Sequence, residues 1–166
     1  MDLIVVGVDR SASAKAALKF ALEEARVRQA RVRVVHAWQF RPPNRRSLAA
    51  EGVPLVLGAN LDGFNRAAAA ELDAIVAEAA PGAGGFGIEK RVEQGDPATV
   101  LIDQSRDADL LVVGSRGHGG FASLVLGSVS QVCAQLAACP VVIVRGRGQP
   151  QAARKRLLQQ IGAATR

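Results

Sequence analysis

The sequence has little cysteine and few aromatic residues. Cys133 and Cys139 are its only cysteines, and their spacing builds neither a disulfide framework nor a CxxC metal or redox motif. We expect both to be small, buried thiols in the reduced state. Aromatic side chains make up 4% of the chain, while alanine and valine are abundant. This composition suits helices that pack closely on a buried sheet.

Long apolar runs are also missing. No stretch approaches the roughly 20 apolar residues that a membrane-spanning helix needs. The N-terminus has only a short apolar run, Leu3 to Val8, without the basic segment and longer apolar core of a signal peptide. We therefore expect a cytoplasmic protein with no membrane partner.

Acidic residues are absent from the last 22 positions, 145–166, which carry six of the 21 basic residues. The remaining 15 basic residues balance the 15 acidic ones, so the net charge of +6 belongs to the C-terminal segment. We expect one domain over residues 1–145 and a basic tail over residues 146–166. Because the body is neutral, no nucleic-acid partner is expected.

Apolar segments of strand length alternate with helical patterns. The predicted strands are Leu3–Val8, Val32–Trp38, Ile88–Val92, Leu110–Val113 and Pro140–Val144. The predicted helices begin near Ser11, Leu61, Pro97 and Ser128, and an irregular segment runs from Gln39 to Asn60. Alternation with mostly apolar strands predicts an α/β fold of three layers, α/β/α, with a five-stranded parallel sheet.

The helical patterns also predict which side chains face the core. For the first helix these are Ala14, Ala17, Leu18, Ala21, Leu22 and Ala25. For the second they are Phe64, Ala68, Leu72, Ile75 and Ala79, and for the fourth Val129, Val132, Cys133 and Leu136.

Glycine is concentrated between the fourth predicted strand and the fourth predicted helix. Four glycines fall within seven residues, at Gly114, Gly117, Gly119 and Gly120. Successive amides in such a loop form an anion-binding concavity. The helix then opens with Gly127-Ser128-Val129-Ser130, where free amides and the helix dipole favour phosphate. Two such elements joined by a nine-residue loop suit a polyphosphate better than a single carboxylate.

These residues form the pattern G-x2-G-x9-G-[ST], matched by Gly114, Gly117, Gly127 and Ser128. The pattern resembles the nucleotide-binding signature of ATP-binding universal stress proteins. The opening Ile4-Val5-Val6-Gly7-Val8-Asp9-Arg10-Ser11, the turn Gly95-Asp96-Pro97 and the segment Cys139–Val144 are similar to that family too. The resemblance covers roughly residues 1–145.

The resemblance implies a Rossmann-like sheet of order 3-2-1-4-5 with ATP across strands one and four. It implies that Asp9 lies near the adenosine and that the Ala37 main chain meets the adenine. Gly114, Arg116, Gly117 and Gly127 would line the ribose and phosphates, and Ser128, Val129 and Ser130 would hold the phosphates. A divalent metal, Mg²⁺, would accompany the nucleotide, although its protein ligands stay unassigned.

Several residues have simpler explanations that the sequence leaves open. Asp9 is also suited to capping the first helix, which is compatible with ligand contact. Arg116 is either a phosphate partner or a solvated loop cation. His118 has no acidic partner nearby in sequence, which favours a loop residue over a general base. Trp38 and His36 are interpreted as core or rim residues.

Three functions follow, and the sequence favours a regulatory ATP-binding protein of the stress response. The alternatives are a slow ATP hydrolase and a nucleotide-independent interaction module. No catalytic residue is predicted, because the strand ends show no paired acids or activated nucleophile. Neither G-x-G-x-x-G after the first strand nor G-x4-G-K-[ST] is present, which excludes a dinucleotide Rossmann domain and a P-loop.

Strand five predicts an association with a second copy. In the implied order it lies at the sheet edge, and its residues 141–144 are all apolar. Exposed edges of this kind recruit another strand. Related universal stress proteins commonly dimerise in this way, so we expect a homodimer through residues 141–144. The sequence does not identify a further protein partner.

Overall fold

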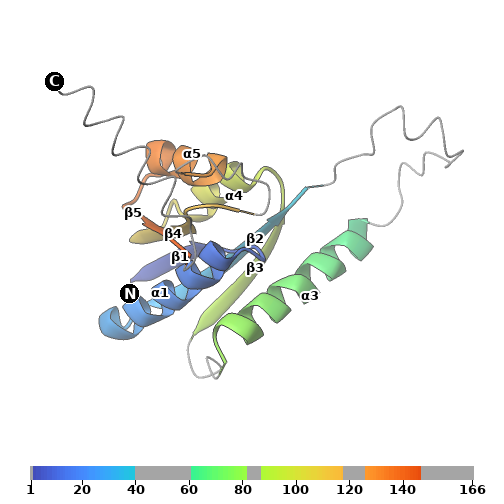
Figure 1. Cartoon of the computed structure of the whole chain (residues 1–166), viewed down its shortest axis with the longest axis horizontal. Coiled ribbons are helices and arrows are strands. Elements are labelled where there is room, and N and C mark those ends of the chain that lie inside the picture. The colour runs from blue at the N-terminus through green and yellow to red at the C-terminus, as the bar shows by residue number, and fades with distance from the viewer. Residues whose placement is uncertain (1, 40–60, 82–86, 118–125, 147–166) are drawn as a thin grey trace, which may run out of the picture.

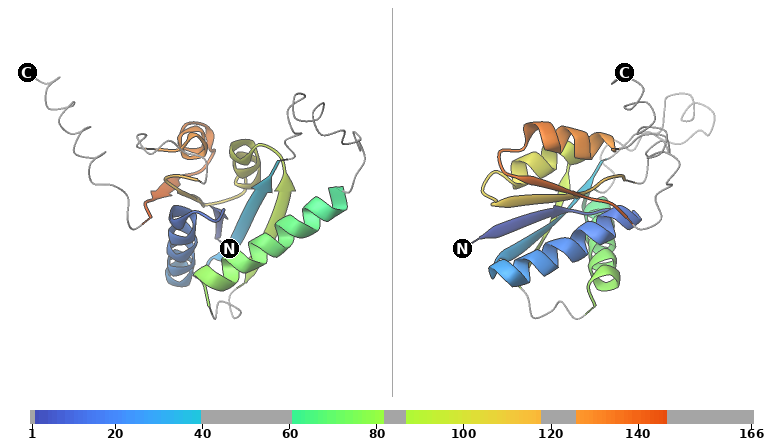
Figure 2. Two further views of the ribbon diagram at one scale, coloured as in Figure 1. Left: turned by 45° about the vertical axis from the view of Figure 1, so that its right-hand side comes forward. Right: turned by 60° about the vertical axis from the view of Figure 1, so that its left-hand side comes forward.

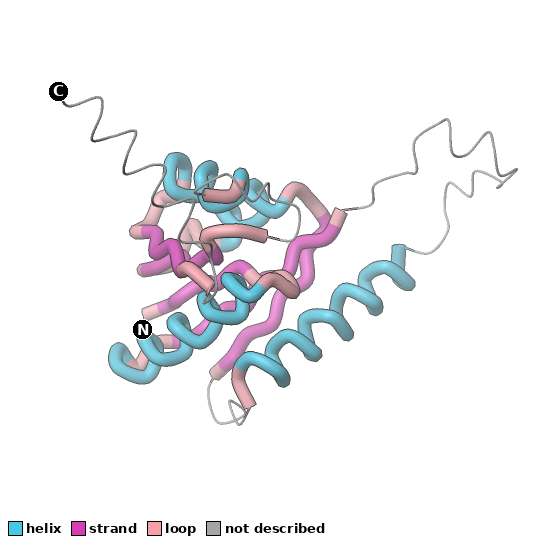
Figure 3. The backbone as a smooth tube through the Cα atoms, in the orientation of Figure 1, coloured by secondary structure: helices cyan, strands magenta, loops and turns pink. Residues whose placement is uncertain are grey.

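The computed structural model describes residues 2–39, 61–81, 87–117 and 126–146. Helices, strands and loops of these residues are distinguished in Figure 3. The strands are β1 (Leu3–Gly7), β2 (Arg31–Trp38), β3 (Ile88–Gln94), β4 (Leu110–Gly114) and β5 (Val141–Val144). The helices are α1 (Ala12–Arg28), α3 (Leu61–Ala79), α4 (Pro97–Gln104) and α5 (Ser128–Leu136) (Figure 1).

All strands pair in parallel, and their order is β3-β2-β1-β4-β5, which confirms the predicted fold. β1 is central, with Val5 opposite Arg33 of β2 on one side and Leu111 of β4 on the other. The order therefore reverses between β1 and β4. In open parallel sheets, ligands bind at such a reversal, beyond the carboxyl ends of the strands.

Helices cover both faces of the sheet, with α1 and α3 on one face and α4 and α5 on the other (Figure 2). Successive β1 side chains alternate between the two cores, as a pleated strand requires. Ile4 packs in the core under α1 and α3, whereas Val5 packs with Leu101 and Cys133 under α4 and α5. Since both cores are apolar, β1 is buried along its whole length.

Side chains cap the starts of α1 and α4, and the cap of α1 is Ser11 rather than Asp9. Ser11 is the N-cap of α1, and its Oγ accepts from the Ala14 N–H at 3.2 Å. Asp96 caps α4 by accepting from the Thr99 N–H at 3.1 Å, and Pro97 occupies the first helical position. The six apolar α1 residues predicted to face the core are all buried.

Two predicted core residues lie at the surface instead. Phe64 is 43% exposed, and its ring stacks on Trp38 with centroids 5.8 Å apart. Leu136 is 64% exposed, because it ends α5 above β5 and no strand lies beyond β5 in the described sheet.

Most of the irregular segment predicted from Gln39 to Asn60 lies outside the described residues, as does the tail from residue 147. Within the described ranges, no helix is both long enough and apolar enough to cross a membrane.

Candidate functional site

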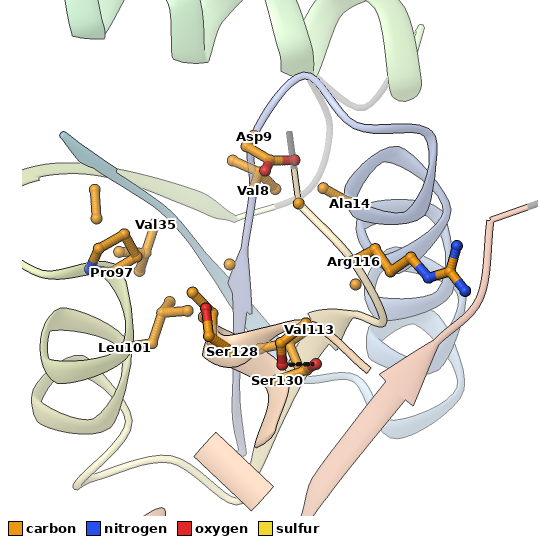
Figure 4. A pocket seen from close by; sticks show the side chains of 16 residues that line it. Val8, Asp9, Ala14, Val35, Pro97, Leu101, Val113, Arg116, Ser128 and Ser130 are labelled. Carbon is orange, nitrogen blue, oxygen red and sulfur yellow. Dashed lines mark hydrogen bonds between the residues drawn. The ribbon is translucent and has the colours of Figure 1, made fainter. Parts of the chain in front are cut away.

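A cavity of about 440 Å³ opens beyond the carboxyl ends of β1, β2 and β4 (Figure 4). The structure brings all nine sequence-predicted site residues to its wall: Asp9, Ala37, Gly114, Arg116, Gly117, Gly127, Ser128, Val129 and Ser130. They come from four separate parts of the chain. The cavity also has wall residues that the sequence did not single out, namely Gly7, Val8, Ala14, Val35, Pro97, Leu101 and Val113.

The first turn of α5 forms one end of the cavity. Its N-cap is Gly127, which makes no side-chain capping bond, whereas α1 and α4 are capped by Ser11 and Asp96. The first amides of a helix have no acceptor within the helix. The α5 amides at the cavity wall are thus not satisfied by a cap. Together with the helix dipole, they make this end attractive to an anion.

The Ser130 side chain plays a different part from the one that its position suggests. Its Oγ donates to the Gly127 carbonyl at 2.9 Å and to the Ser115 carbonyl at 3.3 Å, and the residue is buried. The Gly127 N–H also donates to the Ser115 carbonyl, at 2.8 Å. These bonds fasten the start of α5 to the end of β4. The Ser128 side chain, by contrast, is exposed.

Asp9 and Arg116 carry the charged side chains of the cavity wall. Asp9 Oδ1 accepts from the Ser11 N–H at 2.9 Å, and a Cβ added to Gly117 would lie 2.8 Å from Asp9 Oδ2. The carboxylate is thus held beside the glycine loop. The Arg116 guanidinium points away from the other wall residues (Figure 4). Its Nε is buried and has no hydrogen-bond partner in the described part of the chain.

The other end of the cavity is apolar. Val35 of β2 lies there beside Pro97 and Leu101 of α4 (Figure 4), and Ala37 of β2 also lines the cavity. α4 approaches the sheet closely, since a Cβ on Gly7 would lie 2.6 Å from Leu101 Cδ1. The sequence predicted a helix that begins at Pro97, but which of its residues reach the cavity depends on how it packs on β1. A cavity with an apolar wall and an amide-rich end suits a ligand with a flat apolar part and an anionic part.

The remaining candidates lie apart from the cavity wall. His36 Nδ1 lies 3.0 Å from the Val8 carbonyl, and Trp38 Nε1 donates to Asn65 Oδ1 at 2.9 Å. Both are core or rim residues, as predicted. His118 lies outside the described residues. No group of three or more metal-ligating side chains occurs among the described residues.

Neither cysteine is in a disulfide. Cys133 is buried as predicted, whereas Cys139 is only half-buried. Burial raises the pKa of the Cys133 thiol to about 11, with a smaller contribution from the charge of Asp96. Burial also raises the pKa of Cys139. Both thiols are therefore protonated near neutral pH, which is unfavourable for a nucleophile or a metal ligand.

Comparison with known proteins points to one family. The family model described as the universal stress protein family matches residues 1–145. Universal stress protein Rv2623 of Mycobacterium tuberculosis (strain ATCC 25618 / H37Rv) is 32% identical over 151 residues, which cover 86% of this chain and 44% of that protein. The chain therefore spans less than half the length of this curated relative.

Solved structures agree in fold. Universal stress protein UspA from Lactobacillus plantarum superimposes with a TM-score of 0.68 at 21% identity, covering 87% of this chain and 97% of that one. A universal stress protein in complex with cAMP superimposes with a TM-score of 0.54 at 26% identity, with the same two coverages of 87% and 97%.

Proposed function

Because this chain belongs to the universal stress protein family, we propose that it is a regulatory stress-response protein that binds ATP in the cavity beyond β1 and β4. The observation that carries the proposal is the division of this cavity into an amide-rich end and an apolar end. Its volume of about 440 Å³ falls within the range of small-molecule sites. The cAMP complex of a related protein supports an adenine nucleotide as the ligand class.

The phosphates would lie at the first turn of α5. Gly127 has an extended conformation, φ −75° and ψ 161°, that any residue can adopt. A Cβ there would meet no atom closer than 3.4 Å, so packing within the protein does not require glycine. It would, however, lie 3.8 Å from the Gly117 nitrogen, in the space beside that amide. Close approach of a phosphate to the Gly117, Ser128, Val129 and Ser130 amides explains the glycine.

The adenosine would occupy the apolar end. Ala37 lies at the cavity wall, one residue before the end of β2. Its main chain can meet the adenine edge there while Val35 and Leu101 contact the ring faces. Asp9 is at the same wall, beside Val8 (Figure 4), and can accept from a ribose hydroxyl. Gly114 and Arg116 contribute main-chain surface to the same wall.

Mg²⁺ fits the site only as a partner of the phosphates. Mg²⁺ keeps several waters and takes one or two carboxylates together with phosphate oxygens. Asp9 is the acidic side chain at the described cavity wall, so it would supply the protein oxygen. Bound Mg²⁺ would offset the repulsion between this carboxylate and the phosphates.

We propose binding without rapid turnover. Described residues at the wall offer one carboxylate and no second acid or histidine beside it to activate water. Bound nucleotide would act by favouring one conformation of the protein over another, which then contacts a partner. A slow ATP hydrolase with the same site is the alternative, and a turnover assay on the full chain separates the two.

We propose that two copies associate through β5. This strand pairs only with β4 in the described sheet and carries no charged residue. The opposite edge, β3, carries Glu89, Lys90, Arg91 and Glu93, which discourage pairing with another chain. A two-fold antiparallel pairing of β5 with the β5 of a second copy covers the free β5 edge of each copy at once.

The test is calorimetric titration of Mg-ATP into wild type, Gly127→Ala and Gly87→Ala. Gly127→Ala should keep the wild-type melting temperature and lose about tenfold or more in affinity, because its methyl group occupies phosphate space. Gly87→Ala is the matched control, since a Cβ there meets nothing within 4 Å. If Gly127→Ala bound Mg-ATP with wild-type affinity, the phosphates would not lie at the start of α5. If the wild-type protein did not bind Mg-ATP, the whole proposal would be wrong.

A further inference from the structure

The two residues that follow β4 are hydrogen-bonded on every main-chain atom that can bond. The Ser115 N–H donates to the Val144 carbonyl at 2.7 Å, and the Ser115 carbonyl accepts from Gly127 and Ser130. The Arg116 N–H donates to Ser13 Oγ at 3.3 Å. The Arg116 carbonyl accepts from Ser11 Oγ at 3.1 Å and, over a short contact, from Ser13 Oγ.

The next main-chain donor, the Gly117 N–H, has no hydrogen-bond partner in the described structure. It belongs to the same peptide unit as the Arg116 carbonyl. A trans peptide is planar, and its C=O and N–H point in opposite directions. Because Ser11 and Ser13 hold the Arg116 oxygen toward the start of α1, they turn the Gly117 N–H away from α1. Gly127 lies beside that amide, and both glycines line the cavity.

Serine suits this position because a hydroxyl both donates and accepts. Ser13 is 2% exposed, and its Oγ accepts from the Arg116 N–H while donating to the Arg116 carbonyl. A Cβ on Gly114 would lie 2.8 Å from Ser13 Oγ, so the absence of that atom leaves room for the hydroxyl. An alanine at position 13 would lose both bonds and leave the Arg116 peptide with the Ser11 contact alone, which fixes its direction less firmly.

We propose that Ser13, assisted by Ser11, is a positioning residue that aims the Gly117 N–H at a phosphate of the bound nucleotide. This inference rests on the proposed ATP site and adds a role for residues of α1 that lie outside the glycine pattern. The Ser13 hydroxyl does not touch the ligand. It acts by fixing the direction of one amide before the nucleotide arrives, so that binding does not have to order it.

The test compares ATP with adenosine, which lacks phosphate, by calorimetric titration of the full-length protein. Ser13→Ala should bind ATP about tenfold more weakly than wild type, as expected for one impaired hydrogen bond to a charged group, with adenosine affinity unchanged. The matched control is Ser105→Ala. Ser105 is also fully buried, and its Oγ donates to the Ile102 carbonyl at 3.1 Å, at the C-terminal end of α4.

A purely structural role for Ser13 predicts equal losses for ATP and adenosine, and that result would overturn the inference. If Ser13→Ala does not fold, Ser11→Gly replaces it, because glycine is tolerated at an N-cap almost as well as serine. Ser11→Gly should also weaken ATP selectively, and an unchanged ratio of ATP to adenosine affinity would count against the inference. If the wild-type protein bound neither ligand, the proposed ATP site itself would be wrong. If the wild-type protein bound both ligands and the variants showed no selective loss of ATP affinity, only the role of Ser13 would be wrong.

Discussion

At the scale of single residues, the glycines of the binding pattern serve different purposes. A Cβ on Gly114 would lie 2.8 Å from the Ala14 nitrogen and the Ser13 carbonyl carbon, which are main-chain atoms that cannot easily move. Gly146 is similar, with a Cβ 2.9 Å from the Ser13 nitrogen. The first turn of α1 therefore packs directly on the ends of β4 and β5. Gly127 has no such close main-chain neighbour, so the space beside its Cα is available to the proposed ligand.

This difference predicts opposite effects of one substitution at two positions. Gly114→Ala should lower the free energy of unfolding by about 1–3 kcal/mol, the usual cost of forcing an extra group into a packed core. Gly127→Ala should leave it nearly unchanged. Urea denaturation of the two variants measures both values. Wild-type stability in Gly114→Ala would show that α1 can shift away from β4 without loss.

The predicted site residues share one cavity, but the sequence did not predict what several of them do there. The glycine pattern and the family resemblance selected nine residues that all line one cavity. They did not predict that Gly114 makes room for α1, or that the Ser130 hydroxyl faces the Ser115 carbonyl. Those roles depend on contacts between segments far apart in the chain, which the spacing of residues within one segment does not predict.

At the scale of helices and strands, periodicity is reliable where the sheet is wide. The apolar face predicted for α1 is buried throughout, because α1 lies over the middle of the sheet. Periodicity fails for Phe64 and Leu136, each at the end of a helix that extends to the margin of the sheet. The apolar pattern along a helix shows which side faces the sheet, but it does not show where the sheet ends.

A charged cluster joins β2, β3 and the turn after α4. Arg33 Nε lies 3.0 Å from Glu89 Oε2, and its Nη1 lies 3.0 Å from Asp107 Oδ1 and 2.8 Å from the Gln104 carbonyl. The hydrogen bond from Arg33 lowers the pKa of Asp107. Partial burial of Glu89 favours its protonated form, but hydrogen bonds from Arg33 and Arg91 outweigh burial and lower its pKa. The cluster thus stabilises the folded state while both acids are ionised.

The direction of these shifts fixes the pH dependence of stability. The pKa values of Glu89 and Asp107 are lowered from 4.5 and 3.8 in the folded state. Their contribution is therefore complete above about pH 5 and is lost as the pH falls through the folded values. Arg33→Met should flatten this acid limb when unfolding is measured from pH 3 to pH 7. The control is Lys90→Met, which breaks an exposed pair with Asp73 and should keep the wild-type slope of unfolding free energy against pH. If Arg33→Met also kept that slope, the cluster would contribute nothing to acid stability.

At the scale of the whole molecule, the alternation of β5 determines which residues a second copy can reach. The Pro140 and Val144 carbonyls accept from Leu111 and Ser115, so they face β4. Main-chain groups of alternate residues in a strand point to the same side. Val142 therefore also faces β4, and Val141 and Ile143 present their amides to the free edge.

Ile143→Pro should convert the proposed dimer to monomer. Proline removes an outward donor while the ladder to β4 remains intact, whereas a proline at Val142 would break that ladder. Ile143→Ala, which shortens the side chain but keeps the N–H, is the matched control and should remain dimeric. Light scattering at tens of micromolar measures the mass. A wild type that is monomeric there, or a dimeric Ile143→Pro, would contradict pairing through β5.

The architecture as a whole was accessible from the sequence. Alternating strands and helices predict a parallel sheet with two covered faces, and the structure confirms it. The strand order came from the family resemblance, because apolar strands alone do not specify their neighbours. The boundary between domain and tail remains a proposal. Gly146 packs on the start of α1, so the folded unit reaches at least that residue.

Native mass spectrometry of the full-length wild-type protein, purified without added ligand and then titrated with Mg-ATP, tests the central proposal most directly. The cavity between β1, β4 and α5 predicts one nucleotide per chain, either retained from the cell or taken up during the titration. A chain that keeps its bare mass at millimolar Mg-ATP would contradict nucleotide binding.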